Sequence, residues 1–83
     1  MRILYFAWLR QKTGLAEETV SPPGTVRDVA GLIAWLAARS PGHAEAFAEA
    51  RQIRAAVNQE FARPADPVAA GDEVAFFPPV TGG

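Results

Sequence analysis

One long helical pattern constrains the fold more than any other feature of the sequence. Thr25 is a favourable N-cap with Asp28 at the third helical position, and Pro41-Gly42 would end the helix. Between these signals apolar residues recur three and four positions apart, which predicts one helix with a single core-facing side. This apolar stripe consists of Val26, Val29, Ala30, Ile33, Leu36 and Ala37, widened by Leu32 and Trp35. A second, shorter helix is predicted over residues 43–51, which are rich in Ala and Glu.

Strand patterns stand on both sides of this helix. The predicted strands cover residues 2–9, 17–20, 53–57, a short segment around Phe61, and residues 73–77. Turns are predicted at Thr13-Gly14 and Asn58-Gln59. This order favours an α+β fold, a β-grasp (ubiquitin-like) domain of residues 1–77, with a mixed sheet of about five strands packed on one main helix. Its first and last strands would be central and parallel neighbours.

One face of such a sheet is left without a helix. Phe6 and Trp8 of the first strand and Phe77 of the last are predicted to lie on this uncovered face, and Phe61 could join them. Either these residues dock onto another protein, or loops and the second helix cover them. A chain of 83 residues has a core that stabilises it by only about 3–5 kcal/mol, so a partner is expected.

Charge and residue usage exclude several classes of function. The net charge is −1 and no basic run appears, so neither nucleic acid nor an anionic membrane is an expected partner. No segment could span a bilayer and no signal peptide is recognised, so a cytoplasmic protein is expected. The chain has no cysteine and one histidine, His43, which excludes disulfides, a thiolate nucleophile and the usual metal clusters. We therefore expect no metal site.

The last stretch, residues 78–83, is predicted to be a flexible tail with a chemical function. Pro78 and Pro79 cannot continue a sheet ladder, so the residues after them should leave the sheet in extended form. Gly82 and Gly83 then present a carboxylate that a narrow tunnel can admit. This carboxylate is inert until it is activated, for which we expect adenylation with ATP. The alternative is a frayed end without function.

Three stretches of the sequence together resemble the small, sulfur-carrier subunit of molybdopterin synthase. They are Leu4-Tyr5-Phe6-Ala7 with Arg10, Ala56-Val57-Asn58-Gln59-Glu60-Phe61, and residues 71–83, which read Gly-Asp-Glu-Val-Ala-Phe-Phe-Pro-Pro-Val-Thr-Gly-Gly. The resemblance spans the whole chain, and its last stretch is the most specific part. Two features depart from the family pattern: Trp8 stands where relatives usually have a polar residue, and the Ala-rich helical middle carries no signature.

The resemblance implies a subunit and cosubstrate rather than an enzyme by itself. A ubiquitin-activating-like adenylyltransferase would adenylate Gly83 with ATP, and a sulfur donor protein would supply the sulfur of a thiocarboxylate. The tail, with Gly82 beside the reacting group, would then enter the large synthase subunit of a heterotetramer. There it would donate sulfur to cyclic pyranopterin monophosphate and form the molybdopterin dithiolene, with no cofactor bound by this chain itself. The residues expected to contact the partner are Phe6, Arg10, Phe61, Phe77, Pro78, Pro79, Val80 and Thr81.

Three other functions stay open at this point. A sulfur carrier for another pathway, such as thiamin thiazole or cysteine synthesis, would share the fold and the Gly-Gly end. A protein modifier would be conjugated through Gly83 to lysines, although a single lysine, Lys12, disfavours chains built on itself. A plain binding module would keep its function without Gly82 and Gly83.

Several charged residues have simpler predicted roles. The acidic pairs at residues 17–18 and 72–73 are predicted to be solvated or to support turns, since nothing basic stands near them in sequence. His43 is predicted to lie on the surface at the start of a helix. Arg10 either donates a salt bridge to the large subunit or is a charge at the end of a strand.

Overall fold

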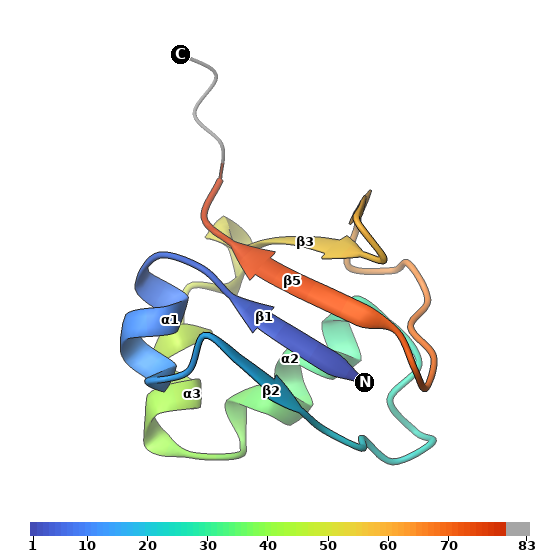
Figure 1. Ribbon diagram of the computed structural model, residues 1–83, viewed down its shortest axis with the longest axis horizontal. Coiled ribbons are helices and arrows are strands. Elements are labelled where there is room, and N and C mark those ends of the chain that lie inside the picture. Colours follow the sequence, from blue (N-terminus) through green and yellow to red (C-terminus); the bar gives the residue numbers. More distant parts are fainter. Residues whose placement is uncertain (80–83) are drawn as a thin grey trace.

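The computed structural model describes residues 1–79 as a five-stranded sheet with helices packed against it (Figure 1). The strands are β1 (Arg2–Tyr5), β2 (Glu17–Thr19), β3 (Arg54–Val57), β4 (Glu60–Ala62) and β5 (Glu73–Phe77). The helices are α1 (Trp8–Thr13), α2 (Val29–Ala37) and α3 (Pro41–Ala46), with a 3-10 helix η1 (Ala50–Gln52). Residues 80–83, which hold the predicted Gly-Gly end, lie outside the described residues. No helix of residues 1–79 is long and apolar enough to cross a membrane.

The sheet has the mixed topology that the sequence predicts. Its strand order is β2-β1-β5-β3-β4, and β1 and β5 run parallel at the centre, with Arg2 opposite Glu73 and Tyr5 opposite Phe76. The pairs β1–β2, β3–β5 and β3–β4 are antiparallel. The α2 helix lies behind the sheet in Figure 1 and covers one of its faces. The prediction of a β-grasp fold is therefore confirmed.

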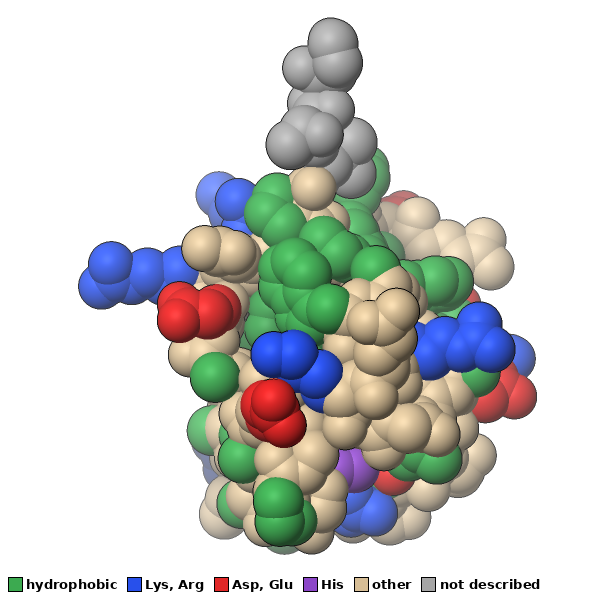
Figure 2. Space-filling model, turned by 90° about the vertical axis from the view of Figure 1, so that its left-hand side faces the viewer, with side chains coloured by type: hydrophobic (Ala, Val, Ile, Leu, Met, Phe, Trp, Pro, Cys, Tyr) green, Lys and Arg blue, Asp and Glu red, His purple; other side chains and the backbone are tan. Residues whose placement is uncertain are grey.

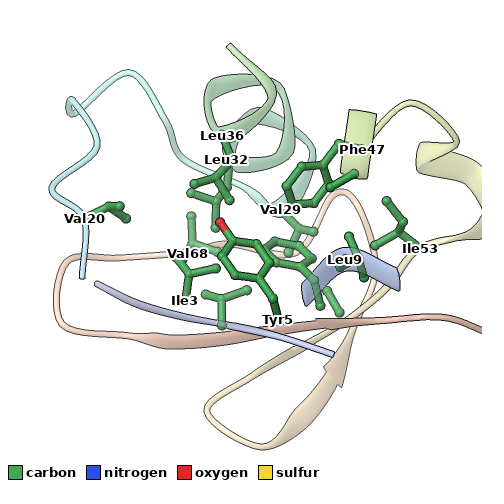
Figure 3. Packing of buried hydrophobic residues seen from close by; sticks show 14 residues of the cluster. Ile3, Tyr5, Leu9, Val20, Val29, Leu32, Leu36, Phe47, Ile53 and Val68 are labelled. Carbon is green, nitrogen blue, oxygen red and sulfur yellow. The ribbon is translucent and has the colours of Figure 1, made fainter. Parts of the chain in front are cut away.

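The core lies between this sheet and the helices (Figure 3). Ile3 and Tyr5 of β1 and Val74 and Phe76 of β5 point to the covered side, where α2 meets them with Val29, Leu32 and Leu36. Leu9, Phe47 and Ile53 close the core from α1, the end of α3 and the start of β3. Leu32, which the sequence places at the margin of the helical stripe, is fully buried, whereas Ala30 is exposed.

The predicted strand over residues 2–9 is wrong after Tyr5. Phe6 N donates to Phe76 O at 3.1 Å, and the next bond of a parallel ladder would need a donor on residue 78, which is a proline. Phe6 O instead accepts from Leu9 N at 3.2 Å, and Ala7 adopts a left-handed φ of 54° that turns the chain into α1. Trp8 therefore lies on a helix and not on the uncovered face beside Phe6.

The boundaries of the helical half also differ from the prediction. The N-cap of α2 is Asp28, whose carboxylate accepts from Gly31 N at 2.7 Å, so the helix starts three residues after the expected cap at Thr25. The single helix predicted over residues 43–51 is two elements, α3 and η1. Pro41 does not end a helix but occupies the first turn of α3, after the N-cap Ser40.

The second half of the sheet follows the sequence closely. The strand β5 has the predicted bounds of 73–77, and β3 and β4 form a hairpin through Asn58 and Gln59. Both turn residues have positive φ, 50° and 71°, as a two-residue hairpin loop requires. The hairpin places Phe61 two residues after its turn, on the edge strand of the sheet.

Candidate functional site

The uncovered face of the sheet carries an exposed aromatic surface, which we call the aromatic patch. Phe61 is 83% exposed and Phe6 is 50% exposed, and both border a shallow depression of about 520 Å³ together with Phe77. The other residues that line it are Ala56, Gln59, Ala75 and Pro78. Figure 2 shows hydrophobic side chains gathered at the end of the molecule where β5 ends. Exposed apolar clusters of this kind are typical of surfaces that bind a protein, a membrane or a ligand.

Strand alternation and sheet register build this patch. On β5, Val74 and Phe76 are buried, so Ala75 and Phe77 point to the opposite face. Ala56 lies opposite Ala75 on one side and opposite Phe61 on the other, which carries the surface across β3 to the edge strand. The rings of Phe61 and Phe77 lie 6.0 Å apart at 59°. Two alanines between large rings leave a hollow that a partner's side chain could fill.

The patch adjoins the point where the chain leaves the sheet. Pro78 lines the patch directly after β5, and Pro79 follows it, half-buried. Neither residue has a backbone N–H, so the ladder ends here. A partner seated on the patch would therefore meet the chain immediately before residue 80.

The structure brings together four of the predicted contact residues, Phe6, Phe61, Phe77 and Pro78. Arg10 lies elsewhere, exposed on α1. Trp8, predicted on the same face as Phe6, instead borders a depression between α1 and the segment after α3. Pro79 follows Pro78 but does not line the patch. The other predicted site residues, Val80, Thr81, Gly82 and Gly83, lie outside the described residues.

Sequence reasoning missed a polar cluster on the covered side of the sheet. Glu18 Oε2 accepts from the Tyr5 hydroxyl at 2.7 Å and from His43 Nε2 at 2.6 Å, and Arg39 donates to Glu18 Oε1 at 3.5 Å. The Nδ1 atom of His43 lies 2.7 Å from the hydroxyl of Ser40. His43 is 6% exposed and Glu18 only 12%, so the predictions of a surface histidine and a solvated glutamate are wrong.

Two signals in the sequence could have located this cluster. Ser40 before Pro41, with His43 three residues after the cap, is an N-terminal helix pattern that turns the imidazole toward the domain. In addition, a tyrosine within an apolar strand needs a partner for its hydroxyl once the ring is buried. Figure 3 shows the Tyr5 hydroxyl directed toward the helical layer.

Two groups of the cluster, Glu18 and Tyr5, have shifted pKa values. Burial alone would raise the pKa of the Glu18 carboxyl, but hydrogen bonds from His43 and Tyr5 and the charge of Arg39 hold it below its ordinary value. Burial, and then the hydrogen bond to Glu18, raise the pKa of Tyr5 well above its ordinary value. Tyr5 is thus a neutral donor to an ionised carboxylate. This arrangement joins β1, β2 and α3, and its role is structural.

Neither the patch nor the cluster resembles a metal site. Within residues 1–79, no group of three or more His, Cys, Asp or Glu side chains is arranged to hold a metal ion.

Comparison with known proteins gives a family and named relatives. The model of the ThiS family matches residues 3–83. The molybdopterin synthase sulfur carrier subunit of Escherichia coli is 40% identical, over the whole of this chain and 99% of that protein. The protein of the same name from Homo sapiens is 35% identical, over the whole of this chain and 93% of that protein.

Solved structures with the same fold include two archaeal proteins. SAMP1 from Haloferax volcanii is similar with a TM-score of 0.74 and 29% identity, over 100% of this chain and 98% of that one. A Pyrococcus furiosus chain, provisionally assigned as molybdopterin converting factor subunit 1, has a TM-score of 0.76 and 28% identity, with 95% of each chain covered.

Proposed function

The chain belongs to the ThiS family, and from this premise we propose that it is the sulfur-carrier subunit of a molybdopterin synthase. The observation that carries the proposal is the match over the full length of the chain, at 35–40% identity, to relatives with that name. The aromatic patch supports the proposal because a carrier must be held by the enzyme that uses it. Its partner would be the large synthase subunit, in a heterotetramer with two copies of each chain.

The reacting group in this proposal is the carboxylate of Gly83. An adenylyltransferase partner joins it to the AMP moiety of ATP and releases pyrophosphate, and a persulfide of a sulfur donor protein then displaces AMP. Reductive cleavage of the resulting acyl disulfide by a thiol leaves a thiocarboxylate. ATP is consumed on the activating partner, so this chain needs no bound cofactor.

The thiocarboxylate would react inside the large subunit. It is an anion at neutral pH, and its sulfur is a better nucleophile than a carboxylate oxygen. Delivery by a tethered tail gives this sulfur a high effective concentration next to the pterin precursor. Two successive carriers would supply the two sulfur atoms of the dithiolene.

The aromatic patch and the prolines have complementary energetic roles. Fixing the backbone of one residue in a bound conformation costs about 1–2 kcal/mol, and more for a glycine. Pro78 and Pro79 reduce this cost because their φ angles are fixed before binding. Burial of aromatic anchors such as Phe61 and Phe77 supplies the remainder, since truncating such an anchor typically costs about 2–4 kcal/mol.

Intact-mass analysis of the C-terminal peptide tests this proposal. The protein is incubated with ATP, a sulfur source, the adenylyltransferase and the sulfur donor protein. The expected product has one oxygen of Gly83 replaced by sulfur, and it reverts to the carboxylate when the large subunit and the pterin precursor are added. A variant without Gly82 and Gly83 serves as the control and should keep its affinity for the large subunit. If Gly83 acquires sulfur but the large subunit and the pterin precursor do not remove it, the protein is a carrier for another pathway.

A protein modifier is the second candidate function. The observation in its favour is the similarity in structure to small archaeal modifier protein 1 of Haloferax volcanii, at 30% identity and a TM-score of 0.74. The same activated Gly83 would then react with a lysine amine instead of a sulfur nucleophile. Isopeptide adducts that depend on Gly83 in cell lysate, without thiocarboxylate in the free protein, would favour the modifier. If neither a thiocarboxylate nor an isopeptide adduct is found, the protein is a plain binding module.

A further inference from the structure

A continuous surface leads from the aromatic patch around the edge strand β4. Phe61 lines the patch, and it also lines a second depression with Arg54 and Arg63. Those two arginines in turn border a groove of about 270 Å³ between α2 and the β3–β4 hairpin. We call this the arginine groove. A protein seated on the aromatic patch therefore has an uninterrupted path over β4 into it.

The arginine groove combines an apolar floor with a positive rim. Val29 and Ile33 of α2 line it on one side and Ile53 on the other. The rim carries Arg51, Arg54 and Arg63, three of the eight basic residues in a chain of net charge −1.

These arginines, Arg51, Arg54 and Arg63, form no ion pair with the described part of the domain, residues 1–79. Arg54 Nη1 donates to the carbonyl of Arg51 at 2.9 Å, which leaves its positive charge at the rim. The adjacent carboxylate, Asp66, uses Oδ2 to accept from the backbone N of Arg63 at 2.8 Å. The groove therefore presents unpaired positive charge above an apolar surface.

We propose, resting on the function proposed above, that an acidic segment of the large synthase subunit passes over β4 and binds in the arginine groove. Guanidinium groups bind carboxylates in paired geometry, so Asp and Glu side chains of that segment would meet Arg51 and Arg63 while an apolar side chain covers Ile33. Charges at the rim of an interface chiefly set the encounter rate and the choice of partner. The aromatic patch supplies affinity, and the arginine groove selects an acidic surface.

Two single charge reversals with a matched control test this inference. Arg51→Glu and Arg63→Glu alter the rim, and Arg27→Glu makes the same change at an exposed arginine that lines neither surface. The dissociation constant for the large subunit of the same organism is measured by calorimetry at low and high salt. Circular dichroism shows that each variant is folded.

Each rim reversal should raise the dissociation constant roughly 3- to 10-fold at low salt, and the effect should shrink as salt screens the charges. Arg27→Glu should change it less than about 2-fold. Rim variants that bind like the wild type, or a control that weakens binding equally, would overturn the inference. If the arginine-groove inference is overturned but Phe77→Ala weakens binding, the proposed function stands without the arginine groove. If the wild-type protein does not bind the large subunit at all, both proposals fail.

Discussion

The Tyr5 hydroxyl and the His43 imidazole bind the same oxygen of Glu18, at 2.7 and 2.6 Å. Tyr5 belongs to the central strand β1 and His43 to α3, while Glu18 lies on β2. The rings of Tyr5 and His43 also meet edge-on, with centroids 5.9 Å apart. Because a buried carboxylate is stable only with partners, this contact fixes the position of α3 on the sheet.

The first prediction is a loss of stability in acid that depends on Glu18. Its pKa is held below the ordinary value, so the folded state binds a proton less readily than the unfolded chain. The stabilisation is therefore full above about pH 4.5 and is lost as the pH falls further. Glu18→Gln should lower the free energy of unfolding by about 1–3 kcal/mol at pH 7, and this difference should narrow in acid. Urea unfolding across pH measures both, and a constant difference would contradict the prediction.

The second prediction concerns the Tyr5 hydroxyl alone. Tyr5→Phe keeps the buried ring and leaves Glu18 paired with His43, so we expect a loss of about 1–2 kcal/mol. The raised pKa of Tyr5 means that its contribution is full below about pH 10 and is lost as the pH rises further. Denaturant titrations at neutral and alkaline pH should show that the difference in free energy of unfolding between the wild type and Tyr5→Phe is smaller in base. An undiminished difference there would mean that the Tyr5 pKa is not raised.

The third prediction tests the close contact between α1 and α3. A Cβ at Gly42 would lie 2.5 Å from the carbonyl oxygen of Lys12, and a backbone atom cannot turn aside. Gly42→Ala should destabilise the protein by about 1–3 kcal/mol. Gly24→Ala is the matched control, because a Cβ there would meet nothing within 4 Å, and it should be neutral or slightly stabilising. Equal thermal stabilities would show that α1 and α3 separate in solution.

Much of the fold was predictable because strand alternation and turn chemistry are local. The bounds of β5 and the turn at Asn58 and Gln59 follow from such signals. The parallel pairing of the first and last strands follows from the order of the elements. The face that carries Phe6, Phe61 and Phe77 was predictable because strand alternation separates the two faces of the sheet and one main helix can cover only one of them. These features depend on residues close in sequence and on the number of elements.

The errors arose where distant residues decide local structure. The end of β1 depends on Pro78, which lacks the N–H that the next ladder bond to Phe6 would need in the folded sheet. The burial of Glu18 depends on His43, which is 25 residues away in the chain. Nothing next to Trp8 in sequence shows that Ala7 takes a positive φ and that a helix starts after it. Such contacts exist only after the chain has folded.

The fourth prediction is a stabilising change in the β3–β4 turn. Gln59 has a φ of 71°, which a residue with a side chain adopts at a cost of roughly 0.5–1 kcal/mol relative to glycine. Gln59→Gly should therefore raise the free energy of unfolding by that amount. Gln11→Gly, the same change on the exposed side of α1, should lower it by about 1 kcal/mol. Chemical unfolding measures both changes in the free energy of unfolding. A gain for Gln59→Gly and a loss for Gln11→Gly would support the turn geometry, and a loss for both variants would contradict it.

The fifth prediction separates the aromatic patch from the core. Phe77 packs against the exposed ring of Phe61 on the face opposite the core residue Phe76, so Phe77→Ala should change the free energy of unfolding by less than about 1 kcal/mol. The same variant should weaken binding to the large synthase subunit by about 2–4 kcal/mol, because a buried aromatic anchor is lost. Leu15→Ala, at an exposed leucine outside the patch, should leave the affinity unchanged. If Phe77→Ala unfolds the protein, Phe77 belongs to the core. If it folds and binds normally, the patch does not dock this partner.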